Sequence, residues 1–273
     1  MGKVFFIDVA KCSGCYNCQF ACKDEHCDNE WLPYAKKQPL TGQFWTKVTE
    51  HVEGSIPKVK IHYIPEMCGH CENPACLNAC AFNAIYKRED GLVIIDPLKC
   101  SGCKACMEAC PYDSIYFNDE LSIAQKCTGC AHLVDAGKTP RCVDVCPTEA
   151  LIYEDEEKIK DKLDGAVCMN SESGCAPKVY YKNIPGKFIA GLIYDEDEEE
   201  VIIGAKCILV NKEDSSVLET ETDDFGDFWF KNLNIGKYSL TIKAKGYKEQ
   251  TFDNLDTTNS INIGDIPFKK INQ

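Results

Sequence analysis

The sequence predicts an α+β protein in which a cysteine-rich domain of short strands and helical turns precedes an all-β sandwich or barrel. Three observations support this prediction. Sixteen of the 20 cysteines fall into four groups of four before residue 147. Short β-prone runs follow the second, third and fourth groups. Residues 187–273 contain one cysteine and consist of several β-prone runs separated by turn residues.

The N-terminal residues 4–8 are β-prone and predict a first strand. They do not resemble a signal peptide, because the apolar run is short and contains an acidic residue. Residues 12–22 then form the first cysteine group, C-x2-C-x2-C-x3-C, with Lys23 directly after it. Residues 23–67 are a long insertion rich in Trp, Tyr and Phe. These aromatics would pack on the protein's own core or against a partner subunit, and the sequence favours neither.

The second group, residues 68–80, has a wider loop, C-x2-C-x4-C-x3-C, and ends before Ala81. Two β-prone runs then flank residues 90–91, an Asp-Gly pair, and predict a β-hairpin. After the third group, residues 114–117 predict another short strand.

The third group is the most regular, since residues 100–111 read C-x2-C-x2-C-x3-C-P. Bacterial [4Fe-4S] ferredoxins have this spacing: three thiolates wrap one cluster and the fourth ligates another. Gly102 favours the tight curl because glycine accepts a positive φ. Pro111 restricts the chain where it leaves the group. A structural zinc site would need two separated C-x2-C pairs, so zinc fits this group poorly.

The fourth group spans residues 127–146 and ends with the same C-x3-C-P pattern, followed by a predicted strand at 148–153. A zinc ribbon could use its first three cysteines, but zinc would not explain why the ending and the strand recur. The four groups therefore form an internal repeat. Its candidate iron ligands are Cys12, Cys15, Cys18, Cys22, Cys68, Cys71, Cys76, Cys80, Cys100, Cys103, Cys106, Cys110, Cys127, Cys130, Cys142 and Cys146.

The remaining four cysteines are expected not to bind iron. Cys168 and Cys175 lie in residues 156–186, which we interpret as a linker or covering segment between a domain at 1–155 and one at 187–273. We expect both to be free thiols rather than a disulfide. Cys207 is expected in a β core, and Cys27 is the least certain of the four because it lies beside the first group.

The C-terminal residues predict strands at 188–194, 216–221, 228–230, 236–243 and 260–263, and a strand pair or one bulged strand at 201–210. The acidic residues 195–200 are interpreted as a solvated hairpin end, with a weak calcium site as the alternative.

Composition restricts the compartment and the partners. Cysteine groups of this kind indicate thiolates on iron in a reducing compartment, so we expect a cytoplasmic protein, although export with a partner stays open. The net charge of −13 argues against a nucleic-acid partner. No apolar run approaches the length of a membrane span. The five histidines are scattered and form no catalytic set, so no catalytic residue is assigned; His70, between two ligands, is expected to donate a hydrogen bond rather than act as a base.

The four groups within residues 1–155 resemble those of the iron–sulfur electron-transfer subunits of the molybdopterin oxidoreductase (dimethyl sulfoxide reductase) family. The resemblance implies that the groups pair crosswise. The implied sets are Cys12, Cys15, Cys18 with Cys146; Cys127, Cys130, Cys142 with Cys22; Cys68, Cys71, Cys76 with Cys110; and Cys100, Cys103, Cys106 with Cys80.

The same resemblance implies four [4Fe-4S] clusters. It implies three if the departures at Lys23 and Ala81, where the family has proline, leave one group empty. Molybdopterin is expected only on a large catalytic partner subunit, with which this protein would form a heterodimer.

Residues 187–263 resemble a prealbumin-like or carboxypeptidase-regulatory-like β-sandwich, through the segments 222–230, 236–238 and 246–247. The two modules together are similar to a branch of the family that moves a hydroxyl group between phenols. This implies an electron-transfer subunit with the active site on the large subunit. The alternatives are a docking subunit whose clusters only maintain the fold, or the electron-transfer subunit of another oxidoreductase.

Overall fold

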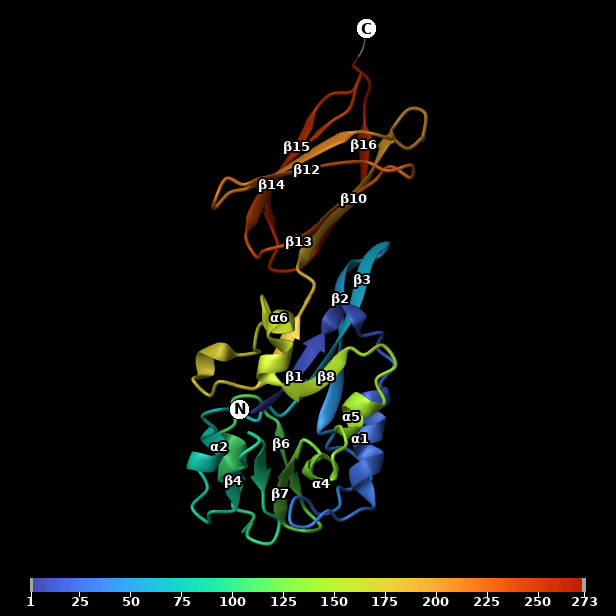
Figure 1. Cartoon of the computed structure of the whole chain (residues 1–273). Coiled ribbons are helices and arrows are strands. Elements are labelled where there is room, and N and C mark those ends of the chain that lie inside the picture. The colour runs from blue at the N-terminus through green and yellow to red at the C-terminus, as the bar shows by residue number, and fades with distance from the viewer. Residues whose placement is uncertain (1, 272–273) are drawn as a thin grey trace. The chain divides into compact units, whose positions relative to one another are not determined.

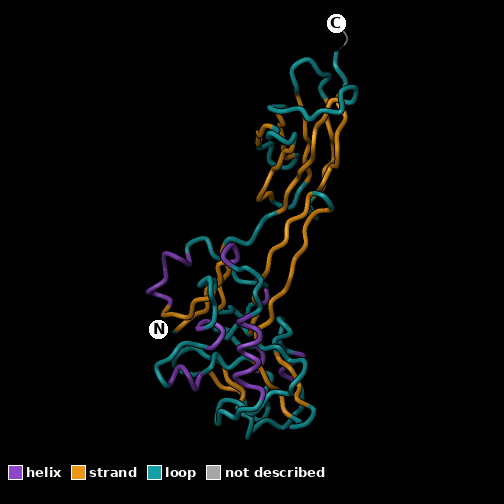
Figure 2. Tube along the Cα trace, turned by 90° about the vertical axis from the view of Figure 1, so that its right-hand side faces the viewer, coloured by secondary structure: helices purple, strands orange, loops and turns teal. Residues whose placement is uncertain are grey.

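The structure is a computed structural model that describes residues 2–271, and it divides into two compact units. The first unit runs up to Glu50 and from His62 to Ile184. The second takes His51 to Ile61 and the chain from Pro185 onward. Figure 1 labels the elements of both units, and Figure 2 shows that the first mixes short helices, strands and long loops while the second is built from strands.

The first unit contains a three-stranded sheet in the order β8-β1-β9. The predicted first strand is β1 (Lys3–Asp8), which pairs antiparallel with β8 (Leu151–Asp155) and parallel with β9 (Val179–Lys182). The four inner residues of β1 are all buried, because apolar clusters cover both of its faces. The sheet thus brings the two ends of the cysteine-rich region together.

Residues 156–184 form part of this unit rather than a free connection. They carry the 3-10 turns η2 (Glu156–Ile159) and η3 (Ser171–Ser173), the helix α6 (Lys160–Leu163) and strand β9. Ile159 packs with Val4 and Phe6 of β1. This segment thus packs against the central strand of the sheet.

The cysteine groups alternate with short helices and hairpins. The predicted hairpin is formed by β4 (Ile85–Lys87) and β5 (Val93–Ile95). A second one pairs β6 (Ile115–Asn118) with β7 (Ile123–Lys126), of which only β6 was predicted. The other elements are η1 (Val9–Lys11), α1 (Asn17–Cys27), α2 (Ala75–Asn78), α3 (Ala105–Glu108), α4 (Ala131–Asp135) and α5 (Arg141–Asp144).

The insertion at 23–67 is more regular than the predicted loop. After α1 and a connecting loop it forms the long hairpin β2 (Thr46–Ser55) and β3 (Lys58–Met67). Its aromatics pack on the protein itself: Trp45 is buried, the Trp31 ring stacks on His132 at 4.1 Å, and the Tyr34 hydroxyl donates to Asp135 at 2.5 Å. These three residues therefore serve the protein's own core.

The second unit is a two-sheet β-sandwich. One sheet has the order β13-β10-β16 and the other β12-β11-β14-β15. The strands are β10 (Lys187–Asp195), β11 (Lys206–Asn211), β12 (Val217–Glu221), β13 (Asp227–Leu233), β14 (Lys237–Lys243), β15 (Gln250–Asp256) and β16 (Ile261–Phe268). β15 was not predicted, whereas Cys207 lies in the core as expected.

The interpretation of residues 195–200 as a solvated end was wrong for Asp195. Its carboxylate is only 2% exposed and accepts hydrogen bonds from the Tyr247 hydroxyl at 2.7 Å and from the Asp197 and Glu198 amides. These bonds lower the pKa of Asp195 to about 2, led by the Tyr247 bond. Only the residues after Asp195 are exposed. Asp195 therefore anchors the loop.

The tip of the β2–β3 hairpin belongs to the second unit and is held by polar contacts. Glu53 accepts from Lys187 Nζ at 2.7 Å and from the Ser260 amide at 3.3 Å. The Asn262 side chain donates to the Ser55 carbonyl at 3.1 Å, and Lys58 pairs with Asp227. An insertion in the cysteine-rich region thus supplies part of the β unit.

Within residues 2–271, no helix is both long and apolar enough to cross a membrane.

Candidate cluster-binding sites

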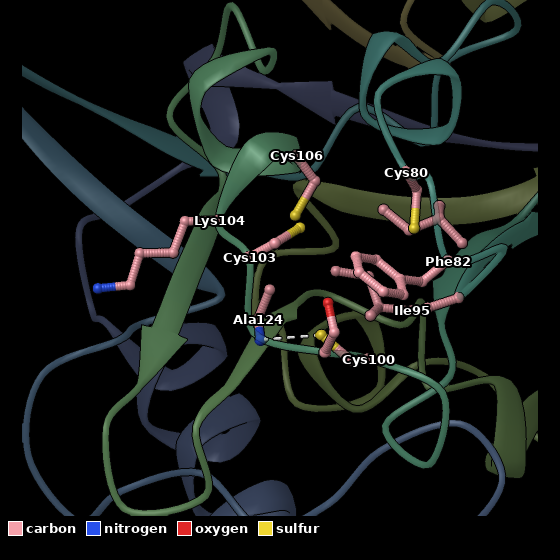
Figure 3. Close-up of a pocket in the computed structure, with 11 residues that line it drawn as sticks. Cys80, Phe82, Ile95, Cys100, Cys103, Lys104, Cys106 and Ala124 are labelled. Atoms are coloured by element: carbon pink, nitrogen blue, oxygen red, sulfur yellow. Dashed lines mark hydrogen bonds between the residues drawn. The ribbon is translucent and has the colours of Figure 1, made fainter.

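One hollow in the first unit is lined by four thiols from two cysteine groups. It has about 310 Å³ of atom-free space and is bordered by Cys80 of the second group and Cys100, Cys103 and Cys106 of the third. Figure 3 shows the four sulfur atoms facing this space, whereas the Lys104 side chain extends away from it. The structure therefore brings together one of the four implied sets.

A second hollow, of about 350 Å³, is bordered by another implied set, Cys68, Cys71, Cys76 and Cys110. Cys175 also lines it. Burial raises the pKa of Cys71 to about 12, and repulsion from the thiolates of Cys68 and Cys175 adds to that shift. Cys175 is thus a fifth sulfur beside this set, a position that its place in the sequence did not indicate.

The members of the two remaining sets lie close enough to shift one another's pKa by electrostatic repulsion. Burial raises the pKa of Cys18 to about 12, and the nearby thiolates of Cys12 and Cys146 raise it further. Burial also raises the pKa of Cys142 well above its ordinary value, with added repulsion from the neighbouring set members Cys130, Cys22 and Cys127. All four crosswise sets are therefore gathered in space.

The loops curl around these hollows through left-handed residues at equivalent positions. Gly14 and Tyr16 of the first group have φ of 67° and 60°, and Gly102 and Lys104 of the third have 74° and 64°. A Cβ at Gly102 would collide with the Ser122 carbonyl, so only glycine fits there. Left-handed turns of this kind direct successive amides into a concave site that favours anions.

A helix begins one residue before the third cysteine of each group. The third cysteine is the second residue of α1, α2, α3 or α5, and the fourth follows four residues later. α2, α3 and α5 end before that point, so Cys80, Cys110 and Cys146 lie beyond the helix and turn toward another set. α1 continues to Cys27, and Lys23 after Cys22 permits this because it keeps the backbone N–H that proline would lack.

Electrostatic repulsion between thiolates of different sets indicates which sets are neighbours. Repulsion from the Cys18 thiolate, which lies in the set of Cys146, helps to raise the pKa of Cys142 in the set of Cys22. Repulsion from the Cys68 thiolate, in the set of Cys110, likewise helps to raise the pKa of Cys127 in the set of Cys22. Repulsion from the Cys76 thiolate, in the set of Cys110, helps to raise the pKa of Cys106 in the set of Cys80. The order is therefore the Cys146 set, the Cys22 set, the Cys110 set and the Cys80 set, each named by its fourth cysteine.

Exposure differs along this row. Cys15 and Cys103 are the two exposed thiols of the chain, and they belong to the two end sets. In the Cys22 set, all four thiols are buried. The row thus begins and ends near solvent and passes through the interior.

The surroundings of the thiols fit a sulfur-rich anionic group. Backbone amides donate to sulfur: Ala124 to Cys100 at 3.4 Å, Gly129 to Cys127 at 3.3 Å, and Arg141 to Cys130 at 3.5 Å. Such N–H donors favour the charged thiolate form that iron binds.

His70 supplies a further buried donor. Burial, reinforced by nearby Lys126, holds the pKa of His70 well below its ordinary value, so the ring is neutral. Its Nδ1 accepts from the Val93 amide at 3.0 Å, which leaves the proton on Nε2. Nε2 is buried without a protein partner among the described atoms. An unpaired N–H there fits a cluster sulfur as acceptor, in keeping with the expectation that His70 donates.

Lys126 is the residue of this region that sequence reasoning missed. It is 2% exposed, and its ammonium donates to Cys68 Sγ at 3.4 Å, to the Cys127 carbonyl at 3.0 Å and to the Val93 carbonyl. Burial alone would lower its pKa, but the thiolates of Cys68, Cys76 and Cys127 outweigh burial and raise it.

Besides Cys175, three cysteines lie outside the sets. Cys207 is in the β-sandwich, the Cys27 thiol faces the Pro39 carbonyl at 3.9 Å, and the Cys168 thiol donates to the Pro177 carbonyl at 3.4 Å. All the cysteines are unbridged. Within residues 2–271, no three His, Cys, Asp or Glu side chains converge closely enough to hold a single metal ion.

Comparison with known families supports the two-module organisation. A profile for 4Fe-4S dicluster domains matches residues 59–156, and one for carboxypeptidase regulatory-like domains matches residues 189–263. These matches confirm the predicted α+β class, with a ferredoxin-type domain followed by a β domain of the prealbumin-like type.

Three curated relatives illustrate the similarity. The pyrogallol hydroxytransferase small subunit of Pelobacter acidigallici is 39% identical over 252 residues, which cover 88% of this chain and 90% of that protein. A tetrathionate reductase subunit of Salmonella typhimurium is 33% identical over 198 residues, which cover 68% of this chain and 74% of that protein. A subunit of the anaerobic dimethyl sulfoxide reductase of Escherichia coli is 35% identical over 138 residues, which cover 50% of this chain and 65% of that protein.

Proposed function

Because this protein belongs to the iron–sulfur subunits of the molybdopterin oxidoreductase family, we propose that its sixteen grouped cysteines hold four [4Fe-4S] clusters that conduct electrons to or from a catalytic subunit. The ligands would be the four crosswise sets. Molybdopterin and the substrate site would lie on that partner, in a heterodimer with this protein.

The observation that carries electron transfer is the row of sets with exposed ends. A bound [4Fe-4S] cluster takes up and releases one electron at a potential set by its surroundings. Cys15 and Cys103 place the two ends of the row near solvent, where a redox partner has access. A purely structural set of clusters would not require exposure at both ends.

The residues of this protein have three tasks in that proposal. The thiols hold the iron, and the backbone amides of Ala124, Gly129 and Arg141 donate to ligand sulfur and orient it. Apolar side chains such as Val93 and Ile115 line the hollow of the Cys110 set and exclude water from it.

The proposed partner reaction is hydroxyl transfer between phenols. Its support is the pyrogallol hydroxytransferase small subunit, which aligns with this protein across both modules. The dimethyl sulfoxide reductase relative aligns over only 50% of it. The alternatives are electron transfer for another oxidoreductase of the family and a docking subunit whose clusters stay in one redox state, because hydroxyl transfer between phenols needs no net electron flow.

Purification of the protein with its native partner under anaerobic conditions tests these proposals. We expect about sixteen irons and as much labile sulfide per chain, and a molybdopterin-containing partner identified by mass spectrometry. Rapid freezing during turnover with a trihydroxybenzene, followed by EPR, should show transient cluster reduction. Reducible clusters that stay silent throughout turnover would favour the docking alternative, and zinc in place of iron in the Cys22 set would refute the crosswise assignment there.

A further inference from the structure

Lys126 is a buried cation without a carboxylate partner. Its three acceptors are Cys68 Sγ and the carbonyls of Val93 and Cys127. Among the described ion pairs, none involves Lys126. A buried ammonium is costly unless a negative group compensates for it. The nearest negative groups are the thiolates of two different sets.

Its position in the row is specific. Cys68 belongs to the Cys110 set and Cys127 to the Cys22 set, which are the two inner sets. The ammonium touches the sulfur of Cys68, but it touches only the main-chain carbonyl of Cys127. The positive charge therefore lies at the junction of the inner sets and acts more directly on the Cys110 set.

One-electron reduction adds a negative charge to a cluster and its thiolates. A fixed positive charge in a dry interior stabilises that added charge strongly, because the local dielectric screens it little. Hydrogen bonds to the sulfurs and net charge are established determinants of such potentials. The fold holds Lys126 rigidly through two carbonyl acceptors, so its charge stays beside Cys68.

We infer that Lys126 is a positioning residue that raises the reduction potential of the cluster in the Cys110 set. An electron in the row would then reside preferentially on a cluster in the interior. This inference rests on the proposed electron-transfer function. It assigns to one side chain the difference between the inner and outer parts of the row.

The test is an EPR-monitored redox titration of the full-length, cluster-loaded protein with dithionite as reductant. In Lys126→Met, the midpoint reduction potential of the Cys110 set should fall by at least about 59 mV, which corresponds to a tenfold change in the one-electron equilibrium. A second midpoint, that of the Cys22 set, should fall by less. The other two should not move. Cys110→Ser identifies which midpoint belongs to the Cys110 set.

Two further variants separate charge from other effects. Lys126→Gln keeps an N–H donor without the charge and should lower the same midpoint. Lys104→Met removes an exposed lysine that directly follows a ligand of the Cys80 set and faces the Phe117 ring at 4.0 Å. It should shift its nearest midpoint by less than Lys126→Met shifts the inner one.

The outcomes are distinct. Four unshifted midpoints in Lys126→Met would overturn the inference and leave the proposed function standing. Loss of iron from both Lys126→Met and Lys126→Gln would also overturn it, because the lysine would then serve assembly. Absence of any iron–sulfur midpoint in the wild-type protein would refute the proposed function itself.

Discussion

The second unit has one continuous apolar core, whereas the core of the first is divided around thiol-lined hollows. In the sandwich, Ile189, Leu209, Phe228 and Leu240 pack together from both sheets, and each is at most 1% exposed. In the first unit, buried apolar residues form several separate clusters, and cysteines of the ligand sets are members of most of them.

This difference determines what stabilises each unit. Burying several thiolates together is unfavourable, as the raised pKa values of Cys18, Cys127 and Cys142 indicate. Iron compensates for these charges, so iron binding contributes free energy of folding to the first unit. The sandwich has no such dependence, because its stability comes from apolar burial and strand pairing.

Removal of iron should therefore produce the largest contrast. After anaerobic chelation, we expect amides of β4 to β7 to lose hydrogen-exchange protection, while those of β11 and β14 keep theirs. Mass spectrometry of exchanged peptides measures both. Loss of protection in both units together would show that they fold as one and would break the comparison.

A single distant ligand should affect one set. Cys146→Ser should lower iron by up to about four atoms per chain and alter the spectrum of the cluster assigned to Cys12, Cys15 and Cys18. Cys168→Ser, outside the sets, is the control and should leave iron unchanged. Damage confined to the cluster of Cys127, Cys130 and Cys142 would contradict the crosswise arrangement.

A cavity in the sandwich should leave the iron in place. Phe228→Ala removes a ring that is 1% exposed and should destabilise the second unit by about 3–5 kcal/mol. Urea unfolding followed by Trp229 fluorescence measures this loss. Phe225→Ala, at a side chain that is 74% exposed, should change stability by less than about 0.5 kcal/mol. Iron lost in step with Phe228→Ala would mean that the sandwich core supports the clusters.

The smallest expected effect concerns Glu53 at the hairpin tip. Burial raises the pKa of Glu53, but bonds from Lys187 and Ser260 outweigh burial and hold it below the ordinary 4.5. Its contribution is therefore present above about pH 4.5 and is lost as the pH falls through the lower folded value. Glu53→Gln should destabilise the second unit by about 1 kcal/mol at pH 7.

That difference between wild type and Glu53→Gln should shrink as the pH falls below 4.5. The control is Glu219→Gln, which breaks the half-exposed pair with Lys206 and should cost about 0.5 kcal/mol or less. A constant difference down to pH 3 would exclude Glu53 titration as its source.

The sequence predicted the features that depend on local spacing. Thiol groups two or three residues apart determine which side chains face one cluster, so the candidate sets were evident from the cysteines and the resemblance. Strand β1, the β4–β5 hairpin and the buried Cys207 followed from apolar patterning and turn residues.

Features that depend on distant contacts were not predicted. Lys126 ends β7, a strand whose four residues, Ile-Ala-Gln-Lys, are all buried. A lysine and a glutamine there suggest exposure, and the acceptors Cys68 and Val93 lie far away in the sequence. The β2–β3 hairpin was missed because its strands are rich in Lys, Glu and His, and because its tip is held by residues after 185.

The crosswise sets are nested along the chain, and this has a consequence for biosynthesis. The Cys110 and Cys80 sets join residues 68–80 to 100–110, and the Cys146 and Cys22 sets join residues 12–22 to 127–146. A polypeptide leaves the ribosome N-terminus first at about 5–20 residues per second. The Cys110 and Cys80 sets are therefore complete once Cys110 has emerged, whereas the Cys146 set has three of its four thiols early and is complete only when Cys146 has been made. Iron delivery would then proceed from the middle of the domain outward, and the earliest thiols to be made would be among the last to be filled.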